Sequence, residues 1–198
     1  MKVVHAYEIH FMKIPGLNTH KIKASLKEGF NDLAKGGFQK IFNHIDQLNI
    51  KKGVDSMGID KFINQCALMA AGSGVITGIG GLSTVLVGIP VDVINLVTQQ
   101  FRVTMAIAYH NTGNYRFPFE DFFKIVATSL KADTGVAISK NVMEEVAEKI
   151  LMGIGSKTSQ RLIPVVGAVI GGTINYLFIK RIAEGIKDEY GKINEVFK

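Results

Sequence analysis

The chain has 198 residues, enough for one domain with a substantial core and too few for two independent enzyme domains. Only 20% of the residues are charged, against roughly 25% in a typical soluble domain, and the net charge of +6 comes without a compact Lys/Arg cluster, so nucleic acid is not an expected partner. The single cysteine, Cys66, excludes an intramolecular disulfide and cysteine-based zinc sites, and no motif for another cofactor is present.

Residues 1–59 are expected to form an N-terminal arm followed by amphipathic helices. Apolar and polar residues alternate before Pro15-Gly16, a breaker pair, which indicates an extended arm or a short strand. Apolar residues at helical spacing over residues 22–33 then predict a helix that ends at Gly36-Gly37. The lysine excess of this part of the chain suits an anionic lipid surface.

A second helix is predicted from Phe38 to Leu48, with its apolar side chains on one face and Lys51-Lys52-Gly53 closing it. Such a helix either packs on the core of the domain or lies in a lipid interface. The next segment begins near Asp60, and residues 60–198 are expected to form a helical domain.

An uncharged run of 30 residues, Phe62 to Val91, dominates the start of that domain. Six glycines lie between residues 72 and 88, and in an exposed helix each would cost about 1 kcal/mol relative to alanine. Gly74 and Gly78 are four residues apart, a spacing that lets a second helix approach closely. The run is therefore predicted to be an apolar, Gly-rich helical stretch that packs tightly against another helix.

Pro90 predicts the start of a long helix that ends near Asn111-Thr112-Gly113-Asn114. Four polar side chains recur in it at steps of three and four residues and so share one face: Asp92, Asn95, Gln99 and Arg102. Such a polar stripe is costly to bury unless its groups pair. Asp92 and Arg102 are about 15 Å apart along the axis, so each needs another partner.

Two further helices are expected before the next apolar run. Phe117-Pro118 opens the first, which carries an aromatic face that continues to Leu130. The second spans Thr134 to Met152 and turns its glutamates outward. We therefore interpret these glutamates as part of a solvent-exposed helix face and not as catalytic carboxylates.

A second uncharged run of 18 residues, Leu162 to Ile179, repeats the Gly-rich character. Gly167 and Gly171 are again four residues apart. The expected partners of the polar stripe come from this run and its borders: Arg161, Asn175 and Lys180. Together these groups form either a structural network that fixes one helix against another or a pocket for a ligand or headgroup. Residues 181–198 continue as an amphipathic helix.

Both uncharged runs approach the length of about 20 residues that a membrane-spanning helix needs. Glycine clusters interrupt the first run and Pro164 lies inside the second. Three arrangements stay open at this point: peripheral or monotopic attachment on the cytoplasmic side of a membrane, a soluble cytoplasmic domain with a very apolar centre, and true spans.

Two segments of the chain resemble the EcsC family. The first runs from Ala70-Ala71-Gly72 through Ile89-Pro90-Val91-Asp92 to Arg102 and Tyr109, and the second is Arg161 to Ala168 followed by Asn175. The resemblance covers residues 60–190 and adds Tyr109 to the candidate polar residues. It implies a bacterial, membrane-associated helical protein whose founding member is encoded beside an ABC transporter, and it implies no known reaction.

These observations favour a non-enzymatic, membrane-associated accessory or scaffold protein, with anionic lipid and an ABC transporter as expected partners. One alternative is a soluble helical carrier that binds a lipid or another apolar ligand between the Gly-rich helices. Another is a hydrolase that uses Asp92 with His110. Those two residues would lie about 27 Å apart on a continuous helix, so they meet only if that helix breaks.

Overall fold

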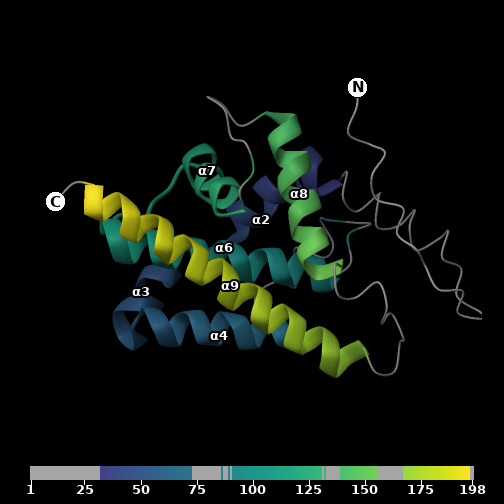
Figure 1. Ribbon diagram of the computed structural model, residues 1–198, viewed down its shortest axis with the longest axis horizontal. Coiled ribbons are helices and arrows are strands. Elements are labelled where there is room, and N and C mark those ends of the chain that lie inside the picture. Colours follow the sequence, from purple (N-terminus) through teal and green to yellow (C-terminus); the bar gives the residue numbers. More distant parts are fainter. Residues whose placement is uncertain are drawn as a thin grey trace, which may run out of the picture.

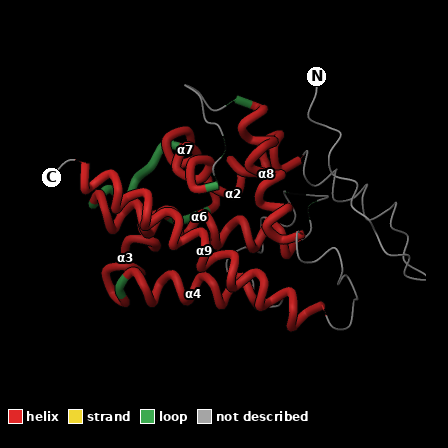
Figure 2. Tube along the Cα trace, in the orientation of Figure 1, coloured by secondary structure: helices red, strands yellow, loops and turns green. Residues whose placement is uncertain are grey.

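A computed structural model describes residues 32–72, 86, 89, 91–130, 132, 139–155 and 167–196. Over these residues the chain is a compact bundle of helices without strands (Figure 1; Figure 2). The predicted all-α class is thereby confirmed. The N-terminal arm, the first glycine pair (Gly74 and Gly78) and Arg161 lie outside the described residues. The elements are the π-helical turn η1 (Leu33–Gly37) and the helices α2 (Phe38–His44), α3 (Gln47–Met57), α4 (Ile59–Ala71), α6 (Val91–Thr112), α7 (Phe119–Ser129), α8 (Lys140–Gly155) and α9 (Gly167–Val196).

The predicted helix over residues 38–48 is two helices. The Asp46 carboxylate accepts hydrogen bonds from the backbone N–H groups of Leu48 (2.9 Å) and Asn49 (3.2 Å), which caps the start of α3. The prediction that Lys51-Lys52-Gly53 closes the helix is wrong, because α3 passes through these residues. Leu48, expected on the buried face, is exposed in the first turn of α3.

Two glycines end helical segments where the sequence predicts an interruption. Gly36 has a φ of 134°, which side-chain-bearing residues rarely adopt, and it breaks the helical conformation inside η1, two residues before α2 begins. Gly113 has a φ of 71°, and its N–H donates to the Tyr109 carbonyl oxygen at 2.8 Å. The predicted C-terminal turn of the long helix is thus confirmed.

α6 is the central helix, and nearly every side chain from Ile94 to Ala108 is buried. In Figure 1 α4 lies below α6, α7 and α8 lie above it, and α9 crosses in front of it and contacts all four of these helices. An aromatic cluster joins α2, α6 and α7, with neighbouring ring centroids 4.9 to 6.0 Å apart. The predicted aromatic face of α7 belongs to this cluster. Its members are Phe38, Phe42, Phe101, Phe119, Phe122 and Phe123.

α8 starts later than the predicted Thr134, at Lys140. Two ion pairs follow its outer surface, each between residues four apart, which agrees with the expected charged face. They join Lys140 to Glu144 at 3.4 Å and Lys149 to Glu145 at 3.0 Å. Pairs of this kind on a surface contribute little to stability, so the buried face of α8 holds it in the bundle.

The described parts of the second Gly-rich run and of the amphipathic C-terminal segment form a single helix of 30 residues, α9, from Gly167 to Val196. It runs antiparallel to α4, since Asp60 near the start of α4 meets Lys187, and Ala71 at the end of α4 meets Gly172. A Cβ on Gly172 would lie 2.6 Å from the Ala71 carbonyl oxygen. The absence of a side chain at this position therefore permits the close approach of the two helices.

No helix among the described residues combines the length and the apolar character that a membrane crossing requires. α4 has 13 residues. α9 is long enough, but Lys180 and Arg181 end its uncharged portion. The uncharged residues 73–85 lie outside the described part of the chain.

Candidate functional site

The C-terminal end of α4 is capped by two asparagine side chains from different helices. The last carbonyl groups of a helix have no partners within it. Asn95 of α6 donates its amide N–H to the Met69 carbonyl oxygen at 2.9 Å, and Asn175 of α9 donates to that of Ala70 at 3.2 Å. The two asparagines, expected from the sequence in one polar network, are thus brought to the same helix end and join α6 and α9 to it.

The polar stripe of α6 continues from Asn95 as a chain of hydrogen bonds. Gln99 donates to the Asn95 Oδ1 at 3.1 Å, and Arg102 donates to the Gln99 Oε1 at 3.0 Å. The Arg102 guanidinium also lies 3.4 Å from the Met69 sulfur and 5.5 Å from the centroid of the Phe62 ring. Each amide therefore both donates and accepts, which makes the stripe compatible with burial.

Asp92 is not part of this chain of hydrogen bonds, although it was expected in the same stripe. It is exposed in the first turn of α6. A carboxylate at that position interacts favourably with the helix dipole and needs no buried partner. Asn95, one turn further on, is the first residue of the stripe that lies against α4.

Tyr109 belongs to a different cluster at the other end of α6. Its hydroxyl donates to the Asp55 carboxylate of α3 at 2.7 Å, and Lys51 forms an ion pair with the same carboxylate. The hydrogen bond from Lys51 and that from Tyr109 hold the pKa of Asp55 below its ordinary value. The cluster joins α3 to α6, about 21 Å along the axis from Asn95.

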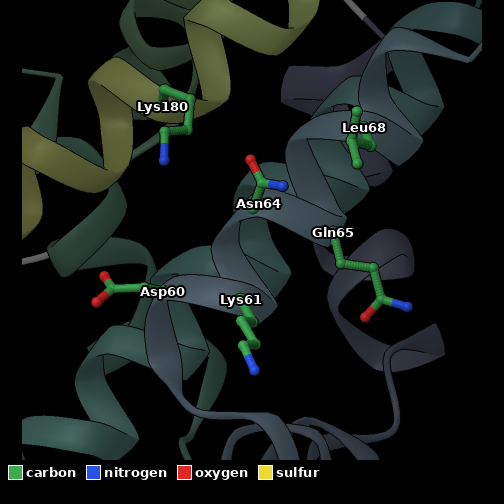
Figure 3. Close-up of a pocket in the computed structure, with 6 residues that line it drawn as sticks. All are labelled: Asp60, Lys61, Asn64, Gln65, Leu68 and Lys180. Atoms are coloured by element: carbon green, nitrogen blue, oxygen red, sulfur yellow. The ribbon is translucent and has the colours of Figure 1, made fainter.

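A shallow groove of about 440 Å³ lies on the surface where α4 and α9 run side by side (Figure 3). Six residues line it: Asp60, Lys61, Asn64, Gln65 and Leu68 from α4, and Lys180 from α9. The sequence does not predict this groove, because it depends on the pairing of two helices more than a hundred residues apart. One signal is nevertheless present, since Lys61 and Lys180 each border one of the two uncharged runs.

The single carboxylate of the groove is already neutralised. Lys187 lies 2.6 Å from the Asp60 carboxylate, and this hydrogen bond, with the charge of Lys187, lowers the pKa of Asp60. Lys61 and Lys180 have no ion pair with any described residue. The groove thus presents two lysines outside any ion pair in the described part of the chain, although the charge of Lys180 also contributes to the lowered pKa of Asp60.

Asn64 adds a hydrogen-bond donor to the groove. Its Oδ1 accepts from the Tyr176 hydroxyl of α9 at 2.7 Å, so the amide N–H groups are left to donate elsewhere. In Figure 3 the Asn64 oxygen lies on the side of Lys180 and the Asn64 nitrogen on the side of Leu68, while the Lys61 side chain points away from both. The polar part of the groove therefore consists of donors from both helices.

Two leucines on the same pair of helices are exposed. Leu68, which lines the groove, has 57% of its surface accessible, and Leu177, three residues before Lys180, has 47%. A single exposed leucine is common on soluble proteins. Leucines beside lysines on adjoining helices are typical of surfaces that contact lipid or another protein.

The arrangement required by the hydrolase alternative is not found. α6 is continuous from Val91 to Thr112, so Asp92 and His110 lie near its opposite ends, about 27 Å apart. The described residues also contain no group of His, Cys, Asp or Glu that could hold a metal ion. Burial raises the pKa of the Cys66 thiol to about 11, which makes it a poor nucleophile at neutral pH.

Replacing Arg102 by alanine tests whether the polar stripe stabilises the bundle. We expect the free energy of unfolding to fall by about 1–3 kcal/mol, since the side-chain carbonyl of the buried Gln99 loses its donor. Arg181→Ala removes an exposed arginine of α9 and should change the value by less than about 0.5 kcal/mol. Urea denaturation of both variants compares the two losses. Equal midpoints of unfolding would show that Arg102 contributes no more to stability than a surface residue does.

No protein-family model, curated protein or solved structure matches the chain. The similarity to the EcsC family therefore rests on the two sequence segments alone. The contacts, charges and exposed side chains of the described residues are the basis for a functional proposal.

Proposed function

We propose that the protein is a non-enzymatic scaffold that attaches peripherally to an anionic membrane on the cytoplasmic side. The observation that carries the proposal is the α4–α9 surface, where Leu68 and Leu177 are exposed close to the unpaired Lys61 and Lys180. From the resemblance to the EcsC family we also propose an accessory role, with an ABC transporter as the partner.

The strength of such an attachment follows from the side chains of this surface. Complete burial of one leucine contributes about 1.5–3 kcal/mol, and each lysine near an anionic bilayer contributes about 1 kcal/mol. Two leucines and two lysines therefore support reversible binding. An attachment of this size depends on both parts, so it requires anionic lipid and weakens as salt screens the charges.

Flotation of the purified full-length protein with lipid vesicles tests the proposal. We expect it to float with vesicles that contain phosphatidylglycerol and to stay behind with vesicles of phosphatidylcholine alone. Raising the salt concentration should release it from the anionic vesicles. In cells, a high-salt wash of the membrane pellet should have the same effect.

Two results would contradict peripheral attachment. Absence of binding to anionic vesicles at low salt would show that the protein does not attach to an anionic membrane. Resistance of the cellular pellet to both salt and carbonate washes would show inserted segments, because carbonate removes proteins that are held only at the surface.

A further inference from the structure

We propose that the α4–α9 groove binds the phosphate of an anionic phospholipid, with Lys180, Lys61 and Asn64 as donors and Leu68 against the apolar part of the lipid. This inference rests on the proposed attachment to anionic membranes and adds the site.

The charges of the groove select an anion over a cation. Its only carboxylate, Asp60, forms an ion pair with Lys187, and a single paired carboxylate beside two lysines is too few oxygen ligands for a metal ion. Lys61 and Lys180 supply positive charge without a partner of their own among the described residues. A bound phosphate would provide the missing counter-charge.

Two of the donors, Lys180 and Asn64, are held in place by the packing of the two helices, whereas Lys61 is exposed. Lys180 is half-buried, so part of its aliphatic stem lies against protein while the ammonium group reaches the groove (Figure 3). The Tyr176 hydroxyl fixes the Asn64 amide by donating to its oxygen. A phosphate therefore meets an amide donor whose orientation is already set, which lowers the entropic cost of binding.

Leu68 favours a lipid over a soluble phosphate compound. It lines the groove one turn after Asn64, and its large exposed surface is buried only if the ligand brings an apolar part. A soluble phosphate would use the lysines and leave this leucine in water. A phospholipid carries its phosphate next to apolar chains. Its phosphate would contact the lysines of the groove while an apolar part contacts the leucine.

Vesicle flotation of full-length variants tests the site. Lys180→Gln and Lys61→Gln should each weaken binding to phosphatidylglycerol vesicles about fivefold, the equivalent of about 1 kcal/mol per lysine, and the double variant about thirtyfold. Lys180→Arg keeps the charge and should retain binding. Lys140→Gln is the matched control, because it removes one lysine, 70% exposed, from α8 and should weaken binding less than twofold.

Asn64→Asp tests the amide separately from the lysines. The carboxylate can still accept from Tyr176, so the fold should persist, while a donor is lost and a negative charge enters the groove. We expect binding to fall more than tenfold. Thermal melting of every variant should match that of the unmodified protein, as expected for surface substitutions.

The outcomes separate the site from the proposed function. Failure of the unmodified protein to bind anionic vesicles would overturn both. Normal binding by the Lys61→Gln/Lys180→Gln double variant would overturn the groove and leave membrane attachment intact. Displacement from vesicles by millimolar glycerol phosphate, together with unchanged binding by Leu68→Gln, would identify a soluble phosphate ligand and overturn the lipid assignment.

Discussion

Replacing Phe101 by alanine is expected to lower the free energy of unfolding by about 3–5 kcal/mol. Phe101 is fully buried at the centre of the aromatic cluster, where its ring centroid lies 4.9 Å from that of Phe122 and 6.0 Å from that of Phe38. Alanine would leave a cavity between α2, α6 and α7, because neighbouring rings relax only partly into the space.

Urea denaturation followed by circular dichroism measures this loss. Leu48→Ala is the control, since that leucine is exposed in α3 and its truncation should cost less than about 0.5 kcal/mol. A domain of this kind is stable by about 5–15 kcal/mol, so the Phe101 variant should still fold at low temperature. A loss below about 1 kcal/mol would contradict the placement of Phe101 in the core.

Gly172→Ala and Gly185→Ala are expected to change stability in opposite directions, although both lie in α9. A Cβ at position 172 would come within 2.6 Å of the Ala71 carbonyl oxygen, so α4 and α9 must separate, at a cost of about 1–3 kcal/mol. Separation would also stretch the hydrogen bond from Asn175 to Ala70. At position 185 nothing lies within 4 Å of the added Cβ, and alanine stabilises the helix by up to about 1 kcal/mol.

Thermal and urea unfolding measure the stability of the two variants, each of which adds one methyl group to a glycine of α9. Destabilisation by Gly172→Ala together with stabilisation by Gly185→Ala is the expected pair of results. If both variants were more stable than the unmodified protein, helix propensity alone would determine both changes. That result would contradict the close contact between Ala71 and Gly172.

Local signals predicted several of the helix ends correctly. Gly113 ends α6 because a residue with positive φ follows its last turn, and Pro118 precedes α7 because its fixed φ suits a helix start. The error at residues 38–48 has the same local origin. The sequence contains a good N-cap in Asp46, yet the periodic apolar residues around it favoured one continuous helix.

The polar stripe was only partly predictable. The spacing of Asn95, Gln99 and Arg102 places them on one face of a helix, and their hydrogen bonds to one another follow from that spacing. Their other partner could not be predicted, because it is the backbone carbonyl of Met69, which carries no sequence signature. Every helix end has carbonyl groups without a partner, and which side chains donate to them depends on how the neighbouring helices pack.

The sequence by itself determined the all-α class, the aromatic face of α7 and the positions of the buried amides on α6, since these depend on periodicities within one helix. Only the tertiary structure decided that α9 packs antiparallel to α4. That pairing brings Lys61 within the same groove as Lys180 and sets Gly172 against Ala71. Contacts between residues so far apart in the chain depend on how whole helix surfaces fit together, and no local pattern encodes that fit.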